Sequence, residues 1–334
     1  MKLRYLAFSD KGEALAVQLA EALGGETSRC GRSLSLAEWT GEAFAQARGL
    51  VFVGAAGIAV RAIAPFVKSK ASDPAVVVVD ECGRFAVPIL SGHLGGANDL
   101  ARTIAAACGA TAVITTATDA NGVFAVDEWA RRQNCRVLDP GKVKEISSAV
   151  LAGKTVRVFS PWPIAGDCPA GVTPAESRED CDVRLDFRAS EGGALRLVPQ
   201  VLTLGIGCRR GTPREALEEA FTALLARSGV CAEAVYASAS IDLKREEAGL
   251  LAFCEAHGWS CRFYSAGELE AASGAFTPSG FVKEITGVDN VCERSAVLSS
   301  GGTLYWKKSA GNGVTMALAQ RPYAPDWRWL SDGE

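Results

Sequence analysis

Short, largely apolar runs that alternate with helical patterns constrain the fold of this chain more than any other feature. The first half contains four such runs, at Leu3–Phe8, Leu50–Val53, Val76–Val79 and Thr111–Ile114. Parallel strands are buried on both faces, so they are apolar along their whole length and do not alternate with polar residues. The pattern therefore predicts a mostly parallel sheet with helices on both faces.

A second series of strands and helices begins near Val201, after a stretch that breaks the pattern. Residues 160–199 contain five prolines and no sustained periodicity, which predicts an irregular connecting region. We therefore predict two α/β domains with mostly parallel sheets, joined by an irregular proline-containing middle region. The predicted boundaries are residues 1–120 for the N-terminal domain, 121–199 for the middle region and 200–334 for the C-terminal domain.

The composition argues against several classes of partner. The chain has 334 residues, 22% of them charged, and a net charge of −3 without a polybasic block, which argues against nucleic acid. No apolar run approaches the length of a membrane span. Charges at Lys2 and Arg4 come too early for a signal peptide. We expect a cytoplasmic protein that does not associate with membranes.

The cysteines also indicate a reducing compartment. There are eleven, an odd number, and none is part of a Cys-x-x-Cys pair, so we expect reduced, mostly buried thiols. Cys254 and Cys261 flank His257, but this spacing is not typical of a zinc site. His257 precedes Gly258 at a predicted helix end, where a histidine usually interacts with the last carbonyl groups. We favour this structural role for His257.

The glycine-rich segment from Gly92 to Asp99 is the strongest candidate for chemistry. It holds His93, one of only two histidines, together with Asn98 and Asp99, just before an alanine-rich helix. Glycines allow a ligand to approach the backbone, and the following helix directs free N–H groups toward an anion. We expect an anionic substrate here, with proton transfer by His93. Helix capping is the alternative role of Asp99, and Glu81, at the end of a valine strand, is either catalytic or a turn residue.

Three further glycine-rich turns, at residues 54–61, 205–211 and 307–313, bring cations with them. Ligands of open α/β sheets collect at such turns, and cations beside free N–H groups suit carboxylates or phosphates. The alternatives are a solvated Arg61, a simple tight turn at 205–211, lysines that protect a strand edge and an Asn-Gly hairpin turn. The candidate substrate-binding residues are Gly54, Gly57, Arg61, Gly92, Gly95, Gly96, Asn98, Gly205, Gly207, Arg209, Arg210, Lys307, Lys308 and Asn312.

Several of these segments closely resemble the CbiG family, the cobalt-precorrin-5A hydrolases of anaerobic cobalamin biosynthesis. The resemblance is carried by residues 54–65, 68–80 and 90–98 in the first half and by 204–212 and 237–246 in the second. It covers roughly residues 45–120 and 200–320. The resemblance implies hydrolysis of a δ-lactone on a cobalt corrinoid, a macrocycle bordered by acetate and propionate groups, with release of acetaldehyde. It also implies that cobalt arrives within the substrate, so we expect no cofactor of the protein's own.

This reaction requires a base, an oxyanion donor and an acid. Our hypothesis from the sequence is that His93 is the base, that Glu81 or Asp99 orients or assists it, and that Asn98 stabilises the oxyanion together with backbone N–H groups of the 92–97 turn. The family resemblance brings no established catalytic residues with it. Contact of His93 with cobalt is a weaker alternative.

Two other functions stay open at this point. The first is a non-catalytic carrier that binds a corrinoid intermediate and passes it to neighbouring methyltransferases of the pathway. The second is a nucleotide-dependent oxidoreductase, against which the glycine spacing at 205–211 argues. Besides the corrinoid, these methyltransferases and further copies of this chain are candidate partners.

Overall fold

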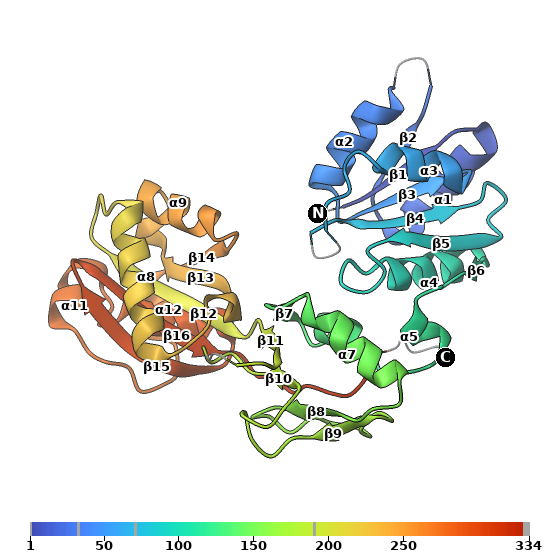
Figure 1. Ribbon diagram of the computed structural model, residues 1–334. Helices are drawn as coiled ribbons and strands as arrows, with labels where there is room; N and C mark the ends of the chain where they lie inside the picture. The colour runs from blue at the N-terminus through green and yellow to red at the C-terminus, as the bar shows by residue number, and fades with distance from the viewer. Residues whose placement is uncertain (1, 32–33, 70–71, 190–191, 330–334) are drawn as a thin grey trace.

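The computed structural model describes residues 2–31, 34–69, 72–189 and 192–329. Residues 70 and 71, which belong to one of the family-like segments, lie outside this description. The described residues form three β-sheets that follow one another along the chain (Figure 1). Each sheet falls within one of the three predicted ranges, whose exact boundaries stay a prediction. Within the described ranges, no helix has both the length and the apolar character needed to cross a membrane.

The N-terminal sheet has six strands in the order β2-β1-β3-β4-β5-β6. The first four are parallel, and β5 runs antiparallel to β4. Its strands are β1 (Leu3–Ala7), β2 (Glu26–Arg29), β3 (Gly49–Val53), β4 (Ala75–Val79), β5 (Phe85–Leu90) and β6 (Thr111–Ala112). Helices α1 (Asp10–Leu23) and α4 (Ala97–Cys108) cover one face, and α2 (Leu36–Gln46) and α3 (Ala56–Ile63) cover the other. Every residue of β3 and β4 is buried, which confirms the expected two-sided burial.

Between residues 160 and 199 the middle region is more regular than its sequence predicts. Five short strands form a sheet in the order β7-β11-β10-β8-β9. They are β7 (Cys135–Val137), β8 (Val156–Phe159), β9 (Val172–Pro174), β10 (Val183–Leu185) and β11 (Leu195–Pro199). The accompanying helices are α5 (Ala117–Ala120), α6 (Val126–Arg132) and α7 (Lys142–Leu151). Strands of three residues are too short to show a period of two, so the expectation of an irregular 160–199 segment was wrong for these stretches.

The C-terminal tail returns from the third sheet to the middle region, as the red segment of Figure 1 shows. Trp327 stacks on Trp129 of α6 with ring centroids 5.2 Å apart. The Trp129 indole N–H donates to the Asp326 carbonyl oxygen at 2.6 Å. The backbone of Asp326 also forms an isolated parallel β-bridge with Ala165. The tail therefore contributes to the core of the middle sheet.

The C-terminal sheet has the order β14-β13-β12-β16-β15, in which β12 is parallel to β13 and antiparallel to β16. Its strands are β12 (Leu202–Cys208), β13 (Val235–Ile241), β14 (Ser260–Tyr264), β15 (Thr303–Gly311) and β16 (Val314–Gln320). Helices α8 (Arg214–Ser228) and α9 (Ala248–Ala256) pack on one face. The remaining elements are α10 (Ala266–Glu270), α11 (Gly280–Thr286), α12 (Val291–Ser300) and the 3₁₀ turns η1 (Ala232–Ala234) and η2 (Asp242–Lys244).

Helix α12 lies directly against β12 at Gly205. A Cβ atom at this position would lie 1.8 Å from the Cys292 carbonyl oxygen and 2.9 Å from the Ala296 Cβ. The neighbouring residues Leu204 and Ile206 point to the opposite face, into the core beneath α8 and α9. Gly205 therefore permits close packing of a helix on a strand, and it does not line the cavity described below, so its expected role in substrate binding stays a prediction.

Ion pairs around His93 join the N-terminal sheet to the middle region. His93 Nε2 lies 2.7 Å from Asp119 Oδ2, and His93 Nδ1 lies 3.0 Å from Asp127 Oδ1. Arg102 of α4 donates a second charged hydrogen bond to Asp119 at 2.7 Å. Burial alone lowers the pKa of His93, but the hydrogen bonds that its ring donates to both carboxylates outweigh this effect and raise the pKa to about 10. His93 is therefore an imidazolium at neutral pH.

A second set of ion pairs connects α4 of the N-terminal sheet to α6 of the middle region. Asp99, in the first turn of α4, pairs with Arg131 and Arg132 of α6. Both arginines also contact Glu128, whose pKa is raised by burial and partly restored by Arg131. The side chains of Asp99, Arg131 and Arg132 are 24%, 27% and 24% exposed, so separating α4 from α6 would break ion pairs that water screens only in part. The network therefore fixes the N-terminal sheet against the middle region.

We predict that Gly205→Ala destabilises the protein, because its new methyl group would overlap the backbone of α12. Overpacking of this kind lowers the free energy of unfolding by about 1–3 kcal/mol. Gly267→Ala is the matched control, since nothing lies within 4 Å of its Cβ position. Urea unfolding of the two variants measures the difference, and equal midpoints would contradict the close approach of α12.

We also predict that His93→Gln destabilises the protein by about 3–5 kcal/mol near neutral pH, the usual cost of removing one partner of a buried ion pair. The pKa of His93 rises on folding from 6.5 to about 10, so its charge stabilises the native state fully below pH 6.5. This contribution is lost as the pH rises through about 10. The wild type should accordingly lose more stability than His93→Gln between about pH 7 and about pH 10. Urea midpoints of both proteins at the two pH values test this, and parallel losses would refute it.

Candidate functional site

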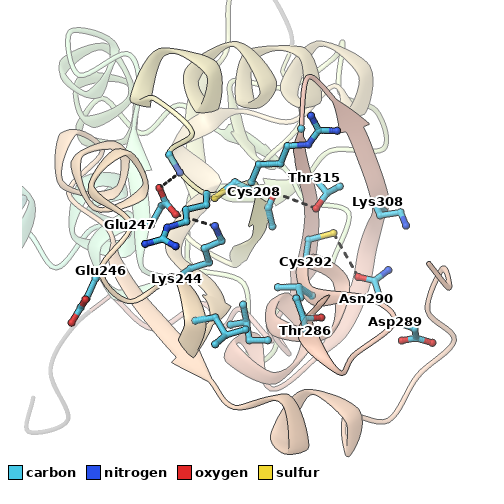
Figure 2. Close-up of a pocket in the computed structure, with 18 of the residues that line it drawn as sticks. Cys208, Lys244, Glu246, Glu247, Thr286, Asp289, Asn290, Cys292, Lys308 and Thr315 are labelled. Carbon is cyan, nitrogen blue, oxygen red and sulfur yellow. Dashed lines mark hydrogen bonds and ion pairs between the residues drawn. The ribbon is translucent and has the colours of Figure 1, made fainter. Parts of the chain in front are cut away.

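The principal cavity of the C-terminal sheet lies at the carboxyl ends of β12 and β13. It has a volume of about 800 Å³ and also reaches β15, β16 and the start of α12 (Figure 2). β12 and β13 are parallel neighbours, so their carboxyl ends lie at the same edge of the sheet. Open α/β sheets bind their ligands outside the carboxyl ends of such strands. The cavity is therefore the best candidate for a substrate site.

Four cations line this cavity, among both apolar and acidic residues. Arg209 and Arg210 are exposed in the loop after β12, Lys244 follows β13, and Lys308 lies on β15. Leu243 contributes an apolar side chain that is 66% exposed to solvent. An exposed apolar surface beside several cations suits a large ligand that combines an apolar body with carboxylates at its edge.

Lys244 and Glu247 form an ion pair in the cavity wall, and Figure 2 shows their side chains facing each other. The Lys244 Nζ lies 2.9 Å from Glu247 Oε2, and the two side chains are only 14% and 11% exposed. The other oxygen of Glu247 accepts a hydrogen bond from the Gly211 backbone N–H at 2.7 Å. The hydrogen bond from Lys244, and after it the one from Gly211, lowers the pKa of Glu247. Glu247 is therefore a fixed carboxylate that links two loops of the site.

The opposite wall is organised by the start of α12. Asn290 caps this helix by accepting from the Glu293 N–H at 2.8 Å, and its amide group donates to the Thr277 carbonyl oxygen. The buried Glu293 carboxylate accepts from Thr277 and, at 2.6 Å, from the backbone N–H of Lys308. Burial raises the pKa of the neighbouring Cys292 to about 12, so this thiol stays protonated and is a poor nucleophile.

The cavity brings together four of the predicted binding residues, namely Gly207, Arg209, Arg210 and Lys308. Lys307 is exposed on β15 and does not line the cavity. β15 is an edge strand, so protection of the edge is the role that Lys307 retains. Asn312 has a φ of +50° beside Gly313, in the hairpin turn between β15 and β16. These positions agree with the alternatives of edge protection and a hairpin turn, and neither residue lines the cavity, so substrate binding by Lys307 and Asn312 stays a prediction.

The predicted N-terminal residues do not converge on a single site. Gly54, Gly57 and Arg61 follow β3, at the carboxyl edge of the parallel strands. Gly95 and Gly96 line a hollow of about 700 Å³ with residues at the starts of β1, β3 and β4, so they lie at the opposite edge. The cause is the reversed direction of β5, which carries the whole 92–99 turn away from the 54–61 turn.

The proposed catalytic residues of this domain are also separated or already paired. Glu81 lies at the carboxyl edge and accepts a hydrogen bond from the Ser9 hydroxyl at 2.7 Å. Asp99 pairs with arginines, and the buried Asn98 amide donates to Thr116 and Asp119. His93 has both ring nitrogens bound to carboxylates and lacks the free lone pair that a base needs. The geometry supports structural roles for His93, Asp99 and Asn98, and the catalytic role expected of His93, Glu81 and Asp99 stays a prediction.

His257 lies at the helix end that the sequence predicted, and its side chain contacts Glu218 and Trp259. It lies at the C-terminus of α9, where its Nε2 is 2.9 Å from Glu218 and its ring stacks on Trp259. Among the residues that the structure describes, no group of three or more His, Cys, Asp or Glu side chains could hold a metal ion.

Sequence reasoning missed Lys244, Glu247 and Asn290 as site residues. Lys244 follows a strand directly and falls within the family-like segment 237–246, so its position after β13 was an available signal. Glu247 and Asn290 had no such signal, because their role depends on contacts with Gly211 and Thr277.

Comparison with known proteins identifies the family. Three family models match in order along the chain: Cobalamin synthesis G N-terminal at residues 38–119, the Cobalamin biosynthesis central region at 124–227 and Cobalamin synthesis G C-terminus at 202–319. A protein of Priestia megaterium named cobalt-precorrin-5A hydrolase is 33% identical over 84% of this chain and 80% of its own length. A Salmonella typhimurium protein of the same name is 35% identical over 83% of each chain.

A crystal structure of a cobalamin biosynthesis protein G homolog from Sulfolobus solfataricus covers 96% of this chain and 97% of its own, at 20% identity and a TM-score of 0.42. The sequence matches cover all three sheets and confirm the resemblance stated above. The chain belongs to the CbiG family of cobalamin synthesis proteins.

Proposed function

We propose that this protein hydrolyses cobalt-precorrin-5A, opening its δ-lactone and releasing acetaldehyde, with the substrate bound in the cavity of the C-terminal sheet. Two relatives that carry this activity in their names align with more than four fifths of the chain. The observation that carries the choice of site is the cavity itself, which combines a volume of about 800 Å³ with four lining cations. A corrinoid with several acetate and propionate groups matches this combination in size and charge.

The substrate would enter with its carboxylates toward the exposed arginines. Arg209 and Arg210 stand at the loop after β12 and have exposed side chains, so they can pair with ligand carboxylates without separating from a buried partner. The exposed Leu243 offers an apolar contact to the macrocycle. We propose that cobalt enters as part of this substrate and that the protein requires no cofactor of its own.

The chemistry requires one molecule of water for each substrate. The water oxygen bonds to the lactone carbonyl carbon, the carbonyl π electrons move to its oxygen, and the ring C–O bond then breaks. The released ring oxygen takes a proton and becomes a hydroxyl group. Deprotonation of this hydroxyl group expels acetaldehyde, and the carbon that is left behind takes up a proton. The protein must therefore stabilise an oxyanion and move protons close to the bound macrocycle.

Anaerobic incubation of the purified protein with cobalt-precorrin-5A tests this function, with acetaldehyde followed through a coupled alcohol dehydrogenase. We expect many molecules of acetaldehyde for each molecule of protein. Binding of the corrinoid without any acetaldehyde would refute the hydrolase and favour the carrier.

Arg210→Ala should raise KM by about tenfold with little change in kcat, because a charged hydrogen bond to a substrate carboxylate is worth about 1.5–3 kcal/mol when it is well formed. Arg262→Ala is the control, since this exposed arginine lies on β14 outside the cavity. Steady-state kinetics of both variants decides the point. Equal KM values for the two variants would show that the substrate carboxylates do not contact Arg210 in the loop after β12.

Dialysis against a chelator before the assay should leave the rate unchanged, since we propose that the only metal is the cobalt held by the substrate. A rate that falls and is restored by an added divalent metal would contradict this proposal.

A further inference from the structure

We propose that the Lys244 ammonium group stabilises the oxyanion formed at the lactone carbonyl, and that Glu247 holds it in place. The inference rests on the proposed function and deepens it, because it assigns a catalytic group within the same cavity. It is carried by the position of Lys244, by its burial and by the contacts of its partner.

The position of Lys244 is fixed by the strand that precedes it. β13 ends at Ile241, and η2 then places Lys244 in the cavity wall without an intervening flexible loop. Figure 2 shows the Lys244 side chain extending along this wall toward Glu247. A cation at the carboxyl end of a parallel strand lies where α/β proteins place groups that contact the ligand.

The pairing with Glu247 leaves part of the ammonium group free. An ammonium group has three N–H donors, and among the described residues the one partner of Lys244 is Glu247, at 2.9 Å. Two donors are therefore free for an acceptor in the cavity. Glu247 uses both of its carboxylate oxygens in these contacts, one for Lys244 and one for the Gly211 N–H. We therefore assign Glu247 the part of a positioning residue, which holds the ammonium group in place.

Burial distinguishes Lys244 from the two arginines of the cavity. Its side chain is 14% exposed, whereas Arg209 and Arg210 are exposed residues. A hydrogen bond to a developing negative charge is stronger where water is largely excluded and where the donor does not need to reorganise. The arginines are suited to bind substrate carboxylates, which are charged before and after the reaction. The ammonium group of Lys244 is suited to stabilise the negative charge on the lactone carbonyl oxygen, which exists only during the reaction.

The assigned step consumes no part of the protein. As water attacks the lactone carbon, a Lys244 N–H donates a hydrogen bond to the carbonyl oxygen, which gains the π electron pair. When the ring C–O bond breaks, the electron pair of the oxyanion re-forms the carbonyl double bond. The water molecule has then supplied the hydroxyl group of the new carboxylic acid and the proton that the ring oxygen takes up. Lys244 remains an ammonium group throughout.

The test compares Lys244→Met, Lys244→Arg and Glu247→Gln in the acetaldehyde assay, with Lys144→Met as the control. Lys144 is an exposed lysine of α7, outside the cavity. Lys244→Met should lower kcat by about 10²–10³-fold, the usual effect of removing one oxyanion donor. The dissociation constant of the corrinoid should stay within about threefold of the wild-type value. It is measured by titrating the protein with the oxidised macrocycle, without turnover, and following the corrinoid absorbance. Lys244→Arg should recover at least about tenfold of the lost kcat, because it keeps the charge.

The positioning role of Glu247 has its own readout. Glu247→Gln should lower kcat in the wild-type background but produce little further loss in the Lys244→Met background, since its effect passes through Lys244. A general structural role for Glu247 would instead lower kcat in both backgrounds. Additive losses would therefore overturn this part of the assignment.

The outcomes separate the two proposals. A wild type that releases no acetaldehyde refutes the proposed function and the role of Lys244 with it. A wild type that turns over while Lys244→Met keeps its kcat leaves the function standing and refutes the role of Lys244. A raised dissociation constant with an unchanged kcat would reassign Lys244 to carboxylate binding, which also overturns the inference.

Discussion

Charges that leave water must find partners, and this constraint organises the molecule at two places. Between the N-terminal sheet and the middle region, the charged side chains are balanced by sign and each is paired with a neighbour. Losing one partner would leave a desolvated charge, so the two parts are held in one arrangement. The cavity of the C-terminal sheet follows the same constraint, since Lys244 and Glu247 are both largely buried and neutralise each other. The fixed arrangement of the N-terminal sheet and the middle region and the fixed position of Lys244 thus have the same physical origin.

The fold was predictable where strands are long and buried on both faces. The valine run of β4 and the apolar β3 identified the N-terminal sheet, because a short apolar run between two helices is typical of a parallel strand covered on both sides. The middle sheet was not predictable in the same way. β9 and β10 have three residues each, and prolines end both β9 and β11, so the local signals were those of a loop. The partners of these strands come from distant parts of the chain, and local sequence does not contain that information.

The sequence predicted those site residues whose position depends on local structure, but not the roles that depend on distant contacts. A glycine turn with cations after a strand identified Arg209 and Arg210, because the position depends only on where β12 ends. The role of His93 could not be obtained in this way. It depends on Asp119 and Asp127, which lie 26 and 34 positions further along the chain, and on the reversal of β5, for which the sequence has no clear signal. A histidine between glycines has the appearance of a catalytic group until its partners are known.

The contacts of Glu247 connect binding and chemistry in the C-terminal cavity. One carboxylate oxygen holds Lys244, and the other holds the backbone of Gly211, in the same loop as Arg209 and Arg210. The loop that meets the substrate carboxylates and the cation assigned to the oxyanion therefore share one anchor. Because this anchor is ordered in the folded protein, substrate binding does not have to assemble it, and the free energy of the carboxylate contacts remains available to position the lactone. A site with this arrangement favours the transition state through geometry that folding has already fixed.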